Sequence, residues 1–230
     1  MKRGFLLLFF AVAAAGFIAL GLWQLQRRVW KLDLIARVDA RVHAPPVAIP
    51  PPMQWPAIDA ADDEYRHVRL QGRYLNDRAT RVDALTEAGA GVWIMTPLIT
   101  NDGTILINRG FVTREHEHDY DRPDGTVSVT GLLRMTEPGG RFLRANRPLD
   151  DAWYSRDVAA IATSRNLGSV APFFVDADAT APGHYPIGGM TVVNFRNMHL
   201  IYALTWFALA GFCVAGVILA LRQKPGDERH

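Results

Sequence analysis

Cysteine is nearly absent from the sequence, since Cys213 is the only one in 230 residues. A single thiol excludes an internal disulfide framework and the paired thiolates of a copper or zinc site. Serine is scarce, no Gly-x-Ser-x-Gly motif occurs, and no glycine-rich phosphate loop precedes a helix. The usual parts of acyl transfer and of nucleotide chemistry are missing, so we predict that the protein is not an enzyme.

An excess of one charge is also missing. The chain has 25 basic and 23 acidic residues, a formal net charge of +2, and the two signs are interspersed. A protein that binds a phosphate backbone needs clustered positive charge. We therefore predict that nucleic acid is not a partner.

The segment His116-Glu117-His118-Asp119 resembles a metal-binding cluster. Alternate side chains of an extended loop point apart, however, and no third ligand with a recognisable spacing accompanies them. The segment is better interpreted as a solvated turn.

Two long hydrophobic runs, residues 4–22 and 200–221, contain no charged side chain. At about 1.5 Å per residue, either run crosses most of a hydrocarbon core roughly 30 Å thick. The alternative for the first run is a cleaved signal peptide. It is longer than the usual run of about 7–15 residues, and its small residues lie in its middle, so we predict two transmembrane helices.

The charges next to these runs predict the topology. The basic residues at the outer ends are Lys2, Arg3, Arg222 and Lys224. They favour the cytoplasm for both ends, including a tail at 222–230. Arg27, Arg28 and Lys31 weaken the charge bias across the first run. We expect a multi-pass protein of the bacterial inner membrane, with the soluble domain 23–199 on the periplasmic side.

The soluble domain begins with two distinct segments. Residues 24–42 space apolar side chains at the helical period, which predicts a helix that continues out of the membrane. Residues 44–56 are rich in proline, which excludes both helix and central strand there. We interpret this second segment as a stiff connector.

Short strands are expected over residues 65–195, separated by turn signals such as Asn101-Asp102-Gly103. The expected strands are Arg66–Tyr74, Thr80–Leu85, Val92–Ile99, Thr104–Val112, Thr126–Met135, Pro172–Asp176 and Thr191–Phe195, and the expected helix is Trp153–Leu167. Hairpins in sequence order predict an antiparallel sheet or small barrel with up-and-down order. The expected fold class is a membrane protein in which two transmembrane helices flank an α+β domain.

His199 is the most distinctive polar residue because it lies at the start of the second run. Tyr202 and Trp206 follow it at helical spacing. The positive end of the helix dipole favours a neutral imidazole, the form that ligates iron. The alternative is an ordinary interfacial histidine within an aromatic belt, bonded to a lipid headgroup.

Residues near the end of the first run could complete a site for a flat ring. Trp23 is an aromatic candidate, and Arg27 or Arg28 could contact carboxylates. Position alone leaves the interfacial interpretation and the iron-ligand interpretation both open.

Taken together, these residues resemble the Surfeit locus 1 family of cytochrome c oxidase assembly factors over nearly the whole chain. The marks are Gly21-x-Trp23-Gln24-x-x-Arg27, Trp30-Lys31, Tyr65, Val68, Gly72, Thr96-Pro97-Leu98, Asn108-Arg109-Gly110-Phe111-Val112, Gly131-x-Leu133-Arg134, Asn146-x-Pro148, Trp153, Arg156-Asp157, Pro186-x-Gly188-Gly189-x-Thr191 and Asn197-x-His199-x-x-Tyr202-Ala203-x-Thr205-Trp206-Phe207. Two departures are Phe111, where the family usually has tryptophan, and Met198, where asparagine is common.

The resemblance implies a two-span assembly factor that handles haem a and assists its delivery to, or insertion into, subunit I of the oxidase. The implied haem iron ligand is His199, with Tyr202, Trp206, Trp23 and Arg27 as the expected haem surroundings. Haem a synthase and membrane lipid are further expected partners. The competing hypothesis is a structural scaffold that stabilises oxidase assembly intermediates in the membrane and binds no haem.

The resemblance also marks Asn108-Arg109-Gly110. We interpret this segment as a strand-end turn that needs the backbone freedom of Gly110. A propionate contact from Arg109 is the less favoured alternative.

Overall fold

The computed structural model describes residues 2–222 except 142, 194 and 196. The chain divides into two compact units, one made of Met1–Arg37 with Asn194–His230 and the other of Val38–Val193. The expected cytoplasmic tail, 222–230, lies outside the described residues apart from Arg222.

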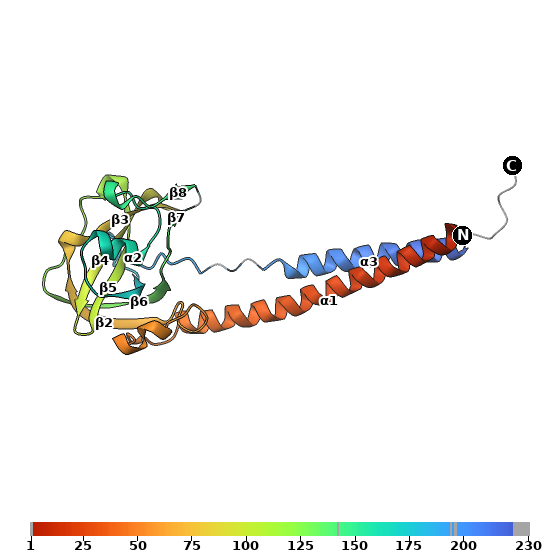
Figure 1. Ribbon diagram of the computed structural model, residues 1–230, viewed down its shortest axis with the longest axis horizontal. Coiled ribbons are helices and arrows are strands. Elements are labelled where there is room, and N and C mark those ends of the chain that lie inside the picture. The colour runs from red at the N-terminus through yellow and green to blue at the C-terminus, as the bar shows by residue number, and fades with distance from the viewer. Residues whose placement is uncertain (1, 142, 194, 196, 223–230) are drawn as a thin grey trace. The chain divides into compact units, whose positions relative to one another are not determined.

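The first unit contains α1 (Lys2–Val42) as far as Arg37, together with α3 (His199–Arg222), and the two helices lie side by side (Figure 1). Both are long and apolar enough to cross a membrane. The 41 residues of α1 make a helix roughly 60 Å long, about twice the hydrocarbon thickness. The expected span 4–22 and the expected helix 24–42 are therefore one continuous helix.

Small residues let these two helices approach closely. Ala14 of α1 and Ala203 and Ala210 of α3 are buried although little else on either helix is. At Gly21, an added Cβ would lie 2.5 Å from the ring of Phe207. Close packing of small residues is the usual basis of helix association in membranes, where lipid competes with apolar side chains.

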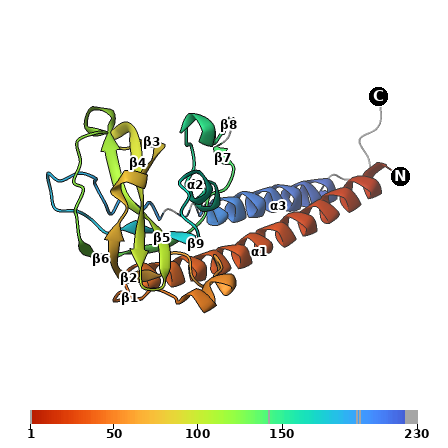
Figure 2. The same cartoon turned by 60° about the vertical axis from the view of Figure 1, so that its left-hand side comes forward.

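The second unit is a small barrel with short flanking elements, seen from a second direction in Figure 2. Its strands are β1 (Val47–Ala48), β2 (His67–Tyr74), β3 (Thr80–Thr86), β4 (Gly89–Thr100), β5 (Gly103–Thr113), β6 (Thr126–Met135), β7 (Gly140–Arg141), β8 (Arg144–Ala145) and β9 (Val170–Ala177), and its helix is α2 (Val158–Ser164). The first five expected strands and the strand expected at 172–176 are confirmed within a few residues.

The barrel closes because β4 pairs with β2 as well as with β5, giving the ring β2-β6-β9-β5-β4. The expectation of an antiparallel sheet in up-and-down order is wrong in two respects. β2 lies between β6 and β4 in the ring, although β3 follows it in the sequence. β9 lies between β5 and β6 and runs parallel to β5. Strand directions cannot alternate all the way around a ring of five, so closure requires one parallel pair.

Two other expectations need correction. No strand forms at Thr191–Phe195 among the residues described there, and the hydroxyl of Thr191 donates to Asp176 instead. The helix expected at Trp153–Leu167 begins only at Val158. The carboxylate of Asp157 accepts a hydrogen bond from the amide of Ala160 and caps it there.

The proline-rich connector, 44–56, contains no central strand, as expected, but the expectation that it contains no helix is wrong in part. β1 pairs only with the edge of β2, and a 3-10 helix follows at Pro52–Ala57. Trp55 of that helix is buried and packs edge-on against Phe173 in the barrel core. The connector is thus tied to the barrel by an aromatic anchor.

Candidate functional site

His199 is the first residue of α3 and is half-buried against α1. Its Nδ1 atom lies 2.8 Å from Oε1 of Gln24. A carboxamide oxygen can only accept, so Nδ1 carries the proton and donates. In the neutral ring, Nε2 then holds the lone pair that could bind a metal ion.

The aromatic residues expected around His199 occupy two different faces. Trp206 stacks on Phe17 of α1, with ring centroids 5.6 Å apart. Tyr202 and Trp23 are each about half exposed, at 52% and 54%. Trp206 therefore belongs to the helix–helix interface, whereas Tyr202 and Trp23 present their rings on the outer surface of the pair.

Arg27 also lies on an exposed face. Its guanidinium sits over the ring of Trp30, 4.1 Å from the centroid, one turn further along the same helix. Lys31 lies in the same way over Phe195, at 4.8 Å. The basic groups that follow the hydrophobic run are thus held against aromatic rings, an arrangement suited to the headgroup level of a membrane.

Gln24 is the contact of His199 that sequence reasoning missed. It was visible in the motif beside Trp23, and it lies three residues after Gly21 on the face that packs against α3. Helical spacing from Phe17 through Gly21 to Gln24 was the available signal. Gln24 has neither an aromatic ring nor a charge, so those two signals do not mark it.

Asn197 adds an unusual feature to the same end of α3. Its Oδ1 atom is buried and has no hydrogen-bond partner among the described residues. A buried acceptor without a donor costs free energy that a ligand bearing a hydroxyl or N–H group could recover. The start of α3 therefore holds two acceptor positions, Nε2 of His199 and Oδ1 of Asn197, that the described protein leaves open.

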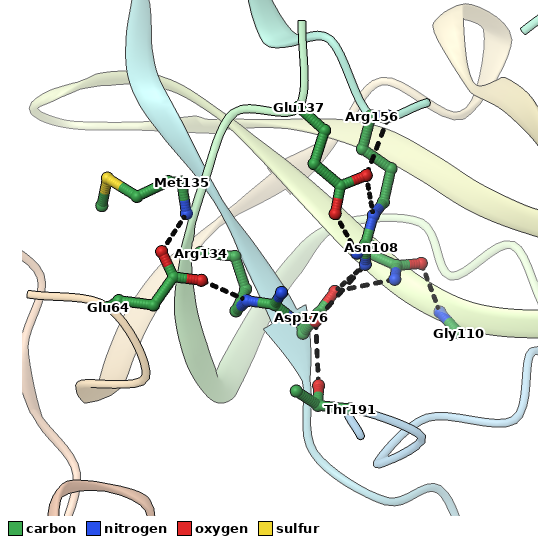
Figure 3. A network of polar contacts seen from close by, with 9 residues as sticks. All are labelled: Glu64, Asn108, Gly110, Arg134, Met135, Glu137, Arg156, Asp176 and Thr191. Carbon is green, nitrogen blue, oxygen red and sulfur yellow. Dashed lines mark hydrogen bonds and ion pairs between the residues drawn. The ribbon is translucent and has the colours of Figure 1, made fainter. Parts of the chain in front are cut away.

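The second unit contains a separate polar network centred on Asp176 of β9 (Figure 3). The Asp176 side chain is only 5% exposed. Its carboxylate accepts hydrogen bonds from Arg134 at 2.8 Å, Arg156 at 3.0 Å and Asn108 at 2.7 Å. Thr191 donates to the same carboxylate at 2.8 Å. The network ties β5, β6 and β9 to two loop segments.

Two further carboxylates pair with these arginines, so the network holds three carboxylates for two guanidinium groups. Glu64 accepts from Arg134 at 2.8 Å, and Glu137 accepts from Arg156 at 3.1 Å. Burial alone would raise the pKa of Glu137, but the hydrogen bonds and charge of Arg156 outweigh burial and lower it. Burial lowers the pKa of Arg134, and Asp176 and Glu64 outweigh that effect and raise it.

A cavity of about 240 Å³ opens beside this network, lined in part by Trp93, Arg141 and Met190. The two arginines of the network form ion pairs with its three carboxylates, so their charge is compensated within the protein. Buried ion pairs of this kind hold a unique arrangement of segments more clearly than they mark a reaction. We assign the network a structural role.

Asn108-Arg109-Gly110 does not form the expected strand-end turn. β5 continues to Thr113, and the register shows a bulge in which Arg109 and Gly110 together oppose Ile94. The bulge directs Arg109 into a buried position, where its guanidinium lies 4.8 Å from the ring of Tyr74. Burial lowers the pKa of Arg109. Its guanidinium donates to the backbone carbonyl of Asp121 at 2.6 Å, and among the described residues it forms no ion pair with a carboxylate.

The two imidazole rings of the segment His116–Asp119 make different contacts. His116 stacks on Tyr185 with ring centroids 4.5 Å apart, and Nδ1 of His118 lies 3.0 Å from Arg81. Across the part of the chain that the structure describes, no three His, Cys, Asp or Glu side chains group closely enough to hold a metal ion.

Comparison with known proteins agrees with this architecture. The SURF1 family model matches residues 11–211. Surfeit locus protein 1 of Mus musculus is 37% identical over 235 residues, which cover 92% of this chain and 73% of the relative. The Homo sapiens protein of that name is 37% identical over 229 residues, covering 89% and 72%. A SURF1-like protein of Monosiga brevicollis is 34% identical over 227 residues, covering 90% and 84%.

The family match begins within α1, covers the barrel and ends within α3, and it includes Gln24 and His199. The resemblance drawn from the sequence motifs is therefore confirmed. The chain belongs to the SURF1 (Surfeit locus 1) family, a family of cytochrome c oxidase assembly factors.

Proposed function

We propose that this protein binds haem a through His199 and assists its delivery to, or insertion into, subunit I of cytochrome c oxidase. The observation that carries the proposal is the state of the His199 ring. Nδ1 is engaged by Gln24, and Nε2 has no partner among the described residues. A histidine with one nitrogen hydrogen-bonded and the other open is the common arrangement of an iron-ligating imidazole.

The position of His199 suits an amphipathic cargo. Haem a carries a long isoprenoid tail that is stable in lipid and propionates that are stable in water. His199 stands where the apolar run of α3 begins, and Arg27 and Lys31 follow the apolar run of α1. Haem a held at this level could place its tail in lipid and its propionates in water.

The residues of the chain would then have distinct roles. Nε2 of His199 supplies the axial bond, and the exposed rings of Tyr202 and Trp23 offer flat apolar surfaces on the outside of the helix pair. Arg27 is available for a propionate. The bond is a reversible one to a single side chain, so release needs only a competing ligand in the oxidase. The role is transfer and not catalysis.

We place the protein in the bacterial inner membrane with α1 and α3 as spans and the barrel in the periplasm. Support comes from the two apolar helices and from the basic residues at their outer ends. Haem a synthase is the expected source of the cargo, and subunit I is the expected recipient.

The test uses membranes from a strain that lacks this gene, complemented with wild type or with His199→Ala. We expect oxidase activity and a-type haem absorbance to fall in the deletion strain and to return only with wild type. Return with both variants, at equal protein levels, would contradict the role of His199 and favour the scaffold hypothesis. Unchanged oxidase in the deletion strain would contradict a role in assembly.

A further inference from the structure

We infer that Gln24 is a positioning residue that fixes the proton of His199 on Nδ1 and so keeps Nε2 open for iron. The inference rests on the proposed haem function and deepens it. The geometry behind it is the 2.8 Å contact between Oε1 of Gln24 and Nδ1 of His199.

The contact selects one of two tautomers. A neutral imidazole carries its single proton on either nitrogen, and the nitrogen without the proton has the lone pair. In water the free side chain favours the proton on Nε2, which would block that atom as a ligand. The oxygen of Gln24 has no proton to give, so it stabilises only the form with the proton on Nδ1.

The same contact also sets the direction in which Nε2 points. The two nitrogens lie on opposite sides of the ring, and anchoring Nδ1 toward α1 turns Nε2 away from Gln24. A ring held in one rotamer and one tautomer loses less freedom when it binds iron than a free ring does. Partners of this kind typically change metal affinity by about 10- to 100-fold when they are removed.

The backbone of α1 is held where Gln24 can reach His199. Gly21, one turn earlier, lies against the ring of Phe207, and Phe17 stacks on Trp206. These contacts bracket Gln24 on one face of α1, opposite the start of α3. Gln24 is therefore positioned by packing on its own side of the contact and does not depend on His199 for its place.

The chain offers a matched control in Gln26. It lies two residues further along α1, carries the same side chain and is exposed. Gln24→Leu and Gln26→Leu remove the same carboxamide from the same helix, so their effects on folding and on membrane insertion should be alike. Gln24→Glu keeps an acceptor oxygen facing His199 and serves as the conservative variant.

The first measurement needs no haem. The full chain is labelled with ¹⁵N-histidine in nanodiscs, and the His199 ring signals are identified by their loss in His199→Ala. We expect the proton on Nδ1 in wild type, Gln26→Leu and Gln24→Glu, and a shift toward Nε2 in Gln24→Leu. If the His199 ring in the Gln24→Leu variant keeps the wild-type tautomer, the inference is overturned.

The second measurement is the affinity of the purified full chain for haem a. We expect Gln24→Leu to bind about 10- to 100-fold more weakly than wild type, with Gln26→Leu unchanged and Gln24→Glu near wild type. If wild type and Gln24→Leu bind haem equally tightly, the inference about Gln24 is overturned and the proposed function is not. Wild type that binds no haem would overturn the proposed function together with it.

Discussion

The guanidinium of Arg134 donates a hydrogen bond of 2.8 Å to the carboxylate of Asp176. The Asp176 side chain is only 5% exposed, so the carboxylate depends on the protein for its hydrogen bonds. Arg156 meets the same carboxylate from a different segment. Removing a charge from such a group leaves the partner charges buried and incompletely paired. The stability of the barrel should therefore be sensitive to a change at Asp176.

Asp176→Asn should therefore lower the free energy of unfolding by about 3–5 kcal/mol. The measurement is chemical denaturation of the full chain in detergent, followed by near-ultraviolet circular dichroism. Asp102→Asn is the control, because Asp102 lies exposed in the turn between β4 and β5. Equal stability of the two variants would contradict the structural role of the network.

Gly110→Ala should destabilise the barrel by about 3 kcal/mol, from backbone strain and from a steric clash. Gly110 has φ +129, and an added Cβ would lie 2.2 Å from the carbonyl oxygen of Ile187. That carbonyl accepts the amide of Phe111 at 2.9 Å, so the clash would separate the segment from β5.

Gly125→Ala separates the two causes. Gly125 also has positive φ, at +86, but no atom lies within 4 Å of the added Cβ. Gly125→Ala should therefore be destabilised only by backbone strain, by about 1 kcal/mol. Thermal unfolding of both variants provides the comparison, and a loss at Gly125 as large as that at Gly110 would contradict the steric argument.

Gly21→Ala should loosen the pair of α1 and α3, because the new methyl group would meet the Phe207 ring at 2.5 Å. We expect a loss of about 1–2 kcal/mol in thermal unfolding in detergent. Gly16→Ala in the same helix is the matched control, since its Cβ meets nothing within 4 Å. Indistinguishable melting curves for the two variants would show that Gly21 is not at a tight interface.

The pH dependence of stability should include a contribution from His67. Burial alone lowers the pKa of His67, but hydrogen bonds to Asp178, at 2.9 Å, and to the Ala44 carbonyl outweigh burial and raise it. A raised pKa means that protonation favours the folded state. The contribution is complete below the ordinary pKa of about 6.5 and is lost as the pH rises through the folded value.

As the pH rises through this range, the melting temperature of wild type should fall. The fall should be smaller in His67→Gln and in Asp178→Asn. Because Asp178 is partly exposed, at 42%, we expect an effect of at most about 1 kcal/mol. Melting curves of the full chain across the neutral range measure it. A wild-type slope retained in both variants would show that the pair does not titrate with folding.

Local patterns were enough to predict most elements of this fold. The Asp102-Gly103 turn and the alternation around it located β4 and β5, and β6 was predicted with its observed bounds. The place of β9 was not predictable in this way. Its pairing with β5 and β6 joins residues far apart in the chain, and the parallel pair follows from closing a ring of five strands.

The site was predicted only in part for a similar reason. His199 stood out because a histidine at the start of an apolar run is unusual. Its partner Gln24 is 175 positions away in sequence, and only the packing of Gly21 against Phe207 brings it within reach. Thr191 was misassigned to a strand, since nothing local shows that its hydroxyl bonds to Asp176.

The most direct test of the proposed function is the absorbance of the full chain purified from cells that also express an active haem a synthase. We predict an a-type haem spectrum for wild type and its loss in His199→Ala, with both proteins melting at the same temperature. An undiminished a-type spectrum in a folded His199→Ala protein would contradict the ligand assignment. Wild type without any a-type haem would contradict haem binding itself.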